Sequence, residues 1–336
     1  MYMKNGYVNM RDIIHSMFAF IFGVGARGIG KSYNCWETLI DDAVETGKKF
    51  IYLRITEDEI DTVCTIESNP IDDIDKYKGR TIFKPINKHM KGIYLDDDKL
   101  IGITASLRTF AKVRGMSFKE YTTIFLDEFI REAHQNKLKH LGEALKQLYE
   151  TVNRNRELEG EPPVKLICMS NALDFNNDIL IEFDIIEVIR KMKLSKQEFY
   201  LSPERSLLVI YPQKSPISQK KKETALYKLG GSFNKMALDN EFREYFEGNV
   251  RSMNLKGFKP MWIYGTMCFY RSTNSDRIWY VTETRKGNFI EEYQETNYER
   301  IQFLKKHIIL HDLYYMGKVF FESSKLEMQF TNLITC

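Results

Sequence analysis

A glycine-rich segment, GARGIGKS at residues 25–32, matches the phosphate-binding pattern GxxxxGK[ST]. It follows an apolar run and opens a predicted helix, so backbone N–H groups and a helix N-terminus can surround phosphate oxygens. Lys31 would bridge the β and γ phosphates of a nucleotide, and the Ser32 hydroxyl would help to hold magnesium. The segment is therefore predicted to be a P-loop that binds ATP with Mg²⁺.

An acidic pair, Asp127 and Glu128, ends the apolar run IFLDE at residues 124–128. Ligands of an open α/β sheet lie beyond the carboxyl ends of its strands, where these two carboxylates would stand. Asp127 would hold magnesium through water, and Glu128 would be the general base that polarises the attacking water. A glutamate in this role is typical of ATPases whose sheet has an added central strand between the P-loop strand and the acidic strand.

Polar and basic residues in two further segments have more than one interpretation. Ser170 and Asn171 end the apolar run at 164–170, where they could sense the γ phosphate or merely open a turn. The segment SLRTFAKVRG contains Lys112 and Arg114, and it could contact DNA or phosphate, or be an exposed basic turn.

Arg154 and Arg156 follow a helix predicted at 137–152. One of them could reach the γ phosphate bound by a neighbouring subunit, as an arginine finger in a ring. Two solvated arginines at a helix end are the alternative, because cations are favourable there.

The predicted fold class is α/β. Short apolar runs alternate with amphipathic stretches as far as about residue 190, which indicates a mostly parallel central sheet with helices on its faces. A hairpin with its turn at 96–99 is expected on one edge. The predicted buried strands are the continuous apolar runs at 18–24, 49–54, 100–106, 122–128 and 164–170.

Three parts are predicted along the chain: a P-loop ATPase domain at 1–203, a helical linker region at 204–248 and a small α+β domain at 249–336. Prolines, a Ser/Lys-rich run and a Gly-Gly pair indicate the connection. Beyond them, 236–248 is predicted to be a helix and 261–288 to be strands around a turn. The basic run KSPISQKKKE is interpreted as a solvated linker from its composition.

The composition of the 336 residues, with 43% hydrophobic and 13% aromatic side chains, predicts a folded protein. Its five cysteines are scattered singly, so neither a zinc site nor a disulfide framework is expected. A net charge of +3 confines any nucleic-acid contact to local clusters. No secretory signal and no run of about 18 apolar residues is found, so an intracellular protein without a membrane partner is expected.

These motifs resemble those of the double-stranded DNA packaging ATPases of small short-tailed phages whose replication is primed by a terminal protein. Past residue 172 the resemblance is carried by order and length rather than by motifs. Up to that point it is carried by five motifs in family order: GARGIGKS with Tyr33, FIYLR at 50–54, LDEFIRE at 126–132, TVNRNRE at 151–157 and SNA at 170–172.

The resemblance implies a terminase-like, pentameric ring ATPase that docks on the portal vertex of an empty capsid and moves viral DNA inward. Its implied partners are double-stranded DNA, the portal protein, its own copies and, in relatives that use one, a packaging RNA. The implied location is the host cell cytoplasm and, transiently, the prohead. By position, Arg154 becomes the trans arginine finger and Arg156 its alternate, while Arg27 resembles a loop arginine of terminases.

Two sets of contact residues complete these assignments. The DNA-contact candidates are Arg54, Lys112 and Arg114, the last two in a basic loop before the acidic strand. The residues assigned to the nucleotide are Gly25, Ala26, Arg27, Gly28, Ile29, Gly30, Lys31, Ser32, Tyr33 and Asn171.

For the C-terminal domain, the resemblance implies an RNase H-like fold. Nucleases of that type hold two metals with several carboxylates. The strand segments here carry no central Asp, only Asp276 in a turn and Glu283 near a strand end. A vestigial domain without nuclease activity is therefore expected, which would grip DNA, the portal or a packaging RNA.

Two other functions stay open from the sequence. One is an ATP-dependent helicase or a nucleic-acid remodeller of the AAA+ type. The other is a nucleotide-gated scaffold that binds nucleic acid without sustained turnover. Glu128 argues against the scaffold, because a switch has less need of a dedicated general base.

Overall fold

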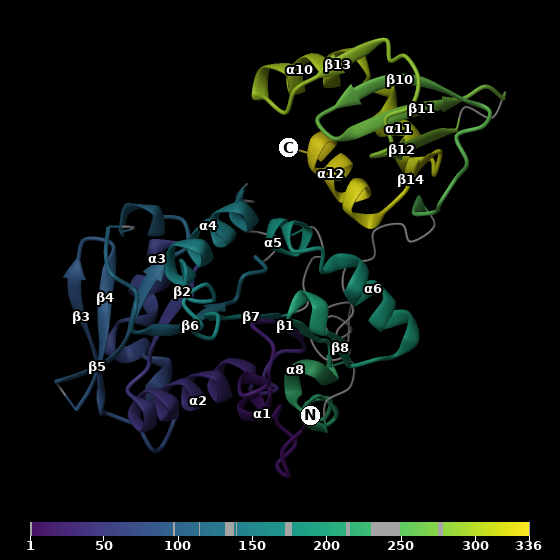
Figure 1. Cartoon of the computed structure of the whole chain (residues 1–336). Coiled ribbons are helices and arrows are strands. Elements are labelled where there is room, and N and C mark those ends of the chain that lie inside the picture. Colours follow the sequence, from purple (N-terminus) through teal and green to yellow (C-terminus); the bar gives the residue numbers. More distant parts are fainter. Residues whose placement is uncertain are drawn as a thin grey trace. The chain divides into compact units, whose positions relative to one another are not determined.

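The structure is a computed structural model of the chain, and it divides into two compact units, Met1–Arg243 and Glu244–Cys336 (Figure 1). Each unit has its own sheet and its own core. The structure describes residues 2–96, 98–113, 115–131, 138, 140–171, 177–212, 216–229, 249–274 and 278–335.

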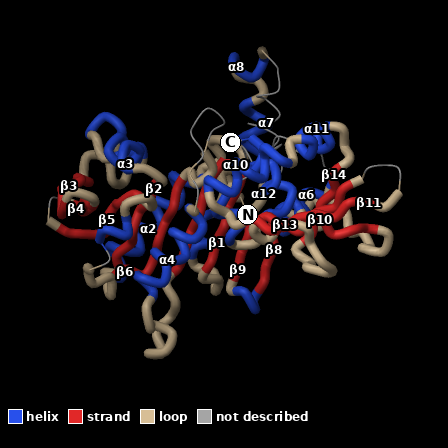
Figure 2. The backbone as a smooth tube through the Cα atoms, turned by 90° about the horizontal axis from the view of Figure 1, so that it is seen from above, coloured by secondary structure: helices blue, strands red, loops and turns tan. Residues whose placement is uncertain are grey.

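The first unit is built on a large, mostly parallel sheet (Figure 2). Its strands are β1 Phe20–Gly25, β2 Lys49–Arg54, β3 Thr81–Asn87, β4 Met90–Leu95, β5 Lys99–Ser106, β6 Tyr121–Asp127, β7 Lys165–Asn171, β8 Phe199–Ser202 and β9 Leu207–Ile210. Among the described residues the nine strands have the order β3-β4-β5-β2-β6-β7-β1-β9-β8. The six strands from β5 to β9 are parallel, and antiparallel hairpins extend both edges.

Helices cover both faces of this sheet (Figure 1). On one face, Trp36 packs against the rings of Tyr52 and Phe125. On the other face, the ring of Phe20 contacts that of Tyr149, and the ring of Phe22 contacts that of Phe183. The helices of the unit are α1 Met10–Ile14, α2 Lys31–Thr46, α3 Glu57–Val63, α4 Leu141–Asn153, α5 Asp178–Glu182, α6 Ile186–Ser195, α7 Pro216–Lys221 and α8 Ala225–Lys228.

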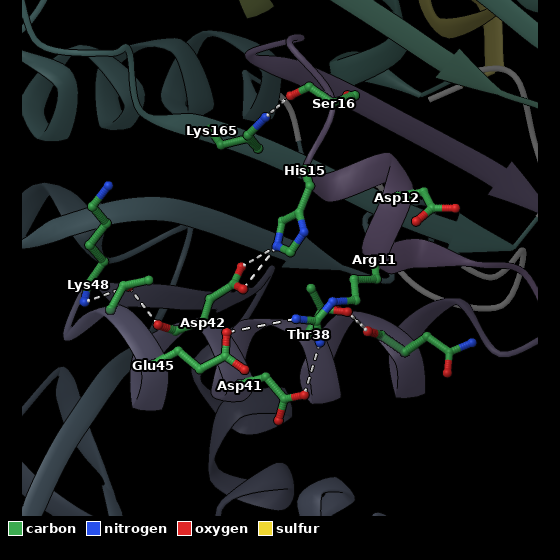
Figure 3. Close-up of polar contacts among 12 residues, drawn as sticks. Arg11, Asp12, His15, Ser16, Thr38, Asp41, Asp42, Glu45, Lys48 and Lys165 are labelled. Carbon is green, nitrogen blue, oxygen red and sulfur yellow. Dashed lines mark hydrogen bonds and ion pairs between the residues drawn. The ribbon is translucent and has the colours of Figure 1, made fainter.

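Polar contacts fix the short helix α1 beside α2, the helix that begins at the P-loop (Figure 3). Arg11 Nη1 lies 3.3 Å from Asp41 Oδ2, and Arg11 Nη2 lies 3.8 Å from Glu45 Oε2. One turn further on, His15 Nε2 lies 2.9 Å from Asp42 Oδ1. Because several of these side chains are half exposed, the pairs contribute little free energy each and mainly set the orientation of α1.

The predicted parallel sheet, its five central strands and the edge hairpin β4–β5 are confirmed. The predicted end of the ATPase domain at residue 203 falls inside the hairpin β8–β9 and is corrected. Leu207–Ile210 is a buried strand paired with β1, so the sheet continues into the predicted linker. Its four apolar residues form a strand that pairs with β1 on one side and with β8 on the other.

The predicted linker is helical where α7 and α8 are described. The helix predicted at 236–248 lies outside the described residues. The helix predicted at 137–152 is observed as Leu141–Asn153, and residues 132–137 and 139 are not described.

The second unit is a small α+β unit, as predicted. Its strands are β10 Phe258–Tyr264, β11 Met267–Ser272, β12 Trp279–Thr282, β13 Glu291–Tyr293 and β14 Val319–Phe321, and its described helices are α10 Asn297–Lys306, α11 Ile309–Tyr315 and α12 Ser324–Thr335. The sheet order is β13-β10-β11-β12-β14. Trp262 and Trp279 stack with their ring centroids 4.7 Å apart beside the apolar core.

Its likeness to an RNase H fold remains a prediction, as does the lack of nuclease activity. Glu283 forms an ion pair with Lys325, with Oε1 and Nζ 3.0 Å apart, and Asp276 lies outside the described residues. No helix in the described part of the chain is long and apolar enough to cross a membrane.

Candidate nucleotide-binding site

The loop between β1 and α2 has the backbone geometry that its glycines predict. Gly28 and Gly30 have φ angles of +68° and +85°, in the left-handed region that side chains with a Cβ rarely adopt. Gly30 is the N-cap of α2. A Cβ on Gly30 would also lie 2.9 Å from Tyr7 Cδ1, so the N-terminal segment packs closely against the loop.

Lys31, the first residue of α2, is buried and directs its ammonium into the loop. Its Nζ donates hydrogen bonds to the carbonyl oxygens of Gly25, at 3.0 Å, and Ala26, at 2.8 Å. The Oδ1 atom of Asn171 lies 3.4 Å from the same nitrogen. Burial lowers the pKa of Lys31 to about 8. A phosphate oxygen would be a stronger acceptor for this ammonium than a neutral carbonyl or amide oxygen.

Ser32 and Asp127 connect the loop to the end of β6. The Ser32 hydroxyl donates a hydrogen bond of 2.8 Å to Asp127 Oδ1. Strand β7 lies between β1 and β6, so the added central strand that the acidic pair predicted is present. Burial raises the pKa of Asp127 to about 6, while the neighbouring Arg54 guanidinium and the Ser32 hydroxyl act in the opposite direction.

Glu128 is held at a sharp turn directly after β6. It has a φ angle of +52°, and its N–H donates to the carbonyl oxygen of Met169 on β7 at 2.7 Å. Its side chain is 51% exposed, and its carboxylate forms an ion pair with Arg54. Positive φ angles of non-glycine residues cluster at functional sites, where neighbouring structure holds them in place.

The structure places Arg54, one of the predicted DNA contacts, beside the acidic pair, and its contact with DNA stays a prediction. Its side chain is only 15% exposed, at the end of β2 beside β6. One guanidinium nitrogen pairs with Glu128, and Nη1 lies 3.7 Å from Asp127 Oδ2. Arg54 could have been placed here from sequence, because the carboxyl ends of parallel neighbouring strands meet at one sheet edge.

The two polar residues at the end of β7 have different positions. Ser170 is buried, and its Oγ accepts a hydrogen bond of 3.0 Å from Ile130 N–H, which fixes the chain just after Glu128. Asn171 lies beside Lys31. Of the two, only Asn171 is placed to respond directly to a group bound by Lys31.

The two finger candidates after α4 also differ. Arg154 is exposed, with a φ angle of +45°, and its side chain donates two long hydrogen bonds, from Nε to the Thr151 carbonyl at 3.3 Å and from Nη2 to the Met116 carbonyl at 3.4 Å. The side chain of Arg156 is 13% exposed and forms an ion pair with Glu161 at 3.0 Å. Arg156 is therefore held by contacts within its own chain, whereas the side chain of Arg154 is exposed.

Four other assigned residues stay predictions. Tyr33 is 41% exposed on α2 and has no described contact that tests its assignment to the nucleotide. Arg27 lies in the loop, and its carbonyl accepts a hydrogen bond from Lys221. Lys112 is exposed and lines a cleft of about 310 Å³ together with Lys88. Arg114 lies outside the described residues.

The site combines a P-loop, an acidic pair on a strand two places away and an inserted strand between them. These features define the class of protein as a P-loop NTPase with a catalytic-type glutamate. Residues 2–259 match the family described as "Podovirus DNA encapsidation protein (Gp16)", and the chain belongs to this family. The family that the motifs predicted is thus confirmed.

The chain is similar to the DNA packaging proteins of Bacillus phages B103 and phi29. It is 30% identical to the B103 protein over 224 residues, 66% of this chain and 63% of the relative. It is 30% identical to the phi29 protein over 226 residues, 66% of this chain and 61% of the relative. The aligned part therefore spans less than two thirds of these relatives.

Two solved structures share the fold. A chain of "The bacteriophage Phi-29 viral genome packaging motor assembly" is 22% identical with a TM-score of 0.65, and the match covers 97% of this chain and 98% of that one. A chain of "The Phi-28 gp11 DNA packaging Motor" is 17% identical with a TM-score of 0.63, and the match covers 99% of both. At these identities the likeness is one of fold.

The raised pKa of Asp127 predicts a pH-dependent effect of Asp127→Asn on stability. Below about pH 3 the carboxyl is mostly protonated in the folded and the unfolded chain, so the substitution changes the free energy of unfolding little. As the pH rises to 6, the unfolded chain ionises first and wild type loses stability. Above pH 6, Asp127→Asn should be more stable by up to about 3 kcal/mol.

Urea unfolding in magnesium-free buffer at pH 4, 5, 6 and 8 measures this difference. Asp75→Asn, which changes an exposed carboxylate, is the matched control and should show no such trend. A difference between Asp127→Asn and wild type that stays constant with pH, or that reverses above pH 6, would contradict the assignment.

Proposed function

We propose that this protein hydrolyses ATP and uses the free energy to move double-stranded DNA into an empty viral capsid. The observation that carries the proposal is the convergence of Lys31, Ser32, Asp127 and Glu128 at one sheet edge. Membership of the DNA encapsidation family supports DNA as the load. The relatives' own description as DNA packaging proteins supports it further.

The triphosphate would be bound by the N–H groups of the loop and by the ammonium of Lys31. Ser32 and Asp127 are suited to hold magnesium, because their oxygens lie 2.8 Å apart and oxygen ligands are those that Mg²⁺ prefers. A bound magnesium ion would neutralise charge on the β and γ phosphates. Asn171 lies beside Lys31 at the end of β7, where its position would depend on whether a γ phosphate is bound.

Glu128 would take a proton from the water that attacks the γ phosphorus. Its carboxylate is engaged by Arg54, so proton uptake by that oxygen requires the ion pair to open. Arg54 would then remain beside the buried Asp127, its second partner. The other carboxylate oxygen of Glu128 is not part of this ion pair and could take the proton while Arg54 orients the group.

The active assembly would be a ring, which we propose to be a pentamer on the portal vertex of the prohead in the host cell cytoplasm. Arg154 is the proposed trans finger, because it is exposed and only weakly bonded within its own chain. The portal protein and duplex DNA are the proposed partners, with a packaging RNA where the phage makes one. Lys112 and Arg114 are the proposed DNA contacts.

Phosphate release in the presence of duplex DNA and empty capsids tests the function. Wild type should be stimulated by both together, and Lys31→Ala should fall at least about 100-fold because it removes the phosphate-binding ammonium. Lys48→Ala, on the exposed turn after α2, is the control and should remain active. Full turnover by Lys31→Ala would refute the site, and strand separation without DNA entering capsids would favour a helicase.

Mixed rings test the role of Arg154. An Arg154→Ala subunit keeps its own nucleotide site, and a Lys31→Ala subunit still offers an intact Arg154 to its neighbour. Mixing the two inactive variants should therefore restore part of the ATP turnover, with a maximum at intermediate ratios. Mixtures that stay inactive at every ratio, although rings form, would rule out a finger supplied in trans by Arg154.

A further inference from the structure

A lysine from the predicted linker lies against the P-loop. Lys221 ends α7, and its Nζ donates a hydrogen bond of 3.0 Å to the carbonyl oxygen of Arg27. A Cβ built on Gly28 would lie 3.1 Å from Lys221 Cε and would collide with the ammonium itself. The ammonium therefore lies directly over the main chain of the loop, where only a glycine leaves room for it.

Helix α7 is held in this position by the N-terminal segment of the chain. A Cβ on Gly6 would lie 3.1 Å from Pro216 Cβ, so the start of α7 packs closely on that segment. The same segment is bonded to the loop, because Val8 N–H donates to the Ile29 carbonyl at 3.0 Å. The N-terminal segment thus contacts both α7 and the loop, and it holds the helix that carries Lys221 beside the loop.

The charge of Lys221 lacks an acidic partner among the described residues. Its described acceptor is the neutral Arg27 carbonyl, although an ammonium can donate three hydrogen bonds. Burial lowers the pKa of Lys221. Burial also lowers the pKa of Lys31, and the nearby charge of Lys221 acts in the same direction. Two ammonium groups close to one loop favour the binding of a polyanion between them.

We propose that Lys221 is a second phosphate-binding lysine, which exchanges the Arg27 carbonyl for an oxygen of the β or γ phosphate of ATP. The proposal rests on the proposed ATPase function and adds a residue from outside the GxxxxGK[ST] pattern. Because α7 and α8 precede the second unit in the chain, nucleotide binding would also restrain the segment that leads to that unit.

Equilibrium binding to the full-length chain tests the proposal, with Mg²⁺ and either a non-hydrolysable ATP analogue or ADP. Lys221→Gln should weaken binding of the analogue about tenfold, as expected for loss of one charge-assisted hydrogen bond. Lys221→Arg should stay close to wild type. Lys220→Gln, which removes an exposed charge from the preceding position, is the matched control. If Lys221→Gln weakens the binding of both ADP and the analogue, Lys221 contacts the β phosphate. If it weakens the binding of the analogue alone, Lys221 contacts the γ phosphate.

Hydrogen exchange of residues 216–228 provides a second readout. The analogue should slow exchange there in wild type and Lys221→Arg, but not in Lys221→Gln. If Lys221→Gln binds and is protected like wild type, while Lys31→Ala loses binding, the role of Lys221 is refuted and the ATPase function stands. If wild type binds no nucleotide, both proposals fail.

Discussion

The hydrogen bond between Ser32 and Asp127 is the contact on which the arrangement of the site depends. It joins the first turn of α2 to the end of β6 over a distance of 2.8 Å, although β7 separates β6 from the loop strand. In the observed sheet order the bond spans the inserted strand β7. The inserted strand also supplies Asn171 to the ammonium of Lys31 and the Met169 carbonyl to the N–H of Glu128. One strand therefore contacts both catalytic motifs.

The same arrangement makes the site electrostatically costly. Asp127 is buried, and burial raises its pKa to about 6, so its ionised form is disfavoured by the fold. Arg54 provides the compensating charge and at the same time engages Glu128. Binding sites often lower the free energy of unfolding in this way, because the same groups must bind a charged ligand. A cation held by Ser32 and Asp127 would supply further compensation.

Local signals in the sequence predicted the loop, the acidic pair and the central strands, because each depends on residues adjacent in the chain. The features that were missed depend on pairing between distant segments. Leu207–Ile210 is a strand because it lies between β1 and β8, and Arg54 is a site residue because β2 lies next to β6. Lys221 lies 194 residues along the chain from Arg27, whose carbonyl it contacts, and its segment has the composition of a linker. Sequence spacing carries no information on such contacts.

We propose that Glu128 is the base that activates water for ATP hydrolysis. Single-turnover hydrolysis by Glu128→Gln measures this most directly, with Glu120→Gln at the other end of β6 as the control. Glu128→Gln should bind ATP as tightly as wild type but hydrolyse it at least about 100-fold more slowly. Hydrolysis by Glu128→Gln at the wild-type rate would show that Glu128 is not the base.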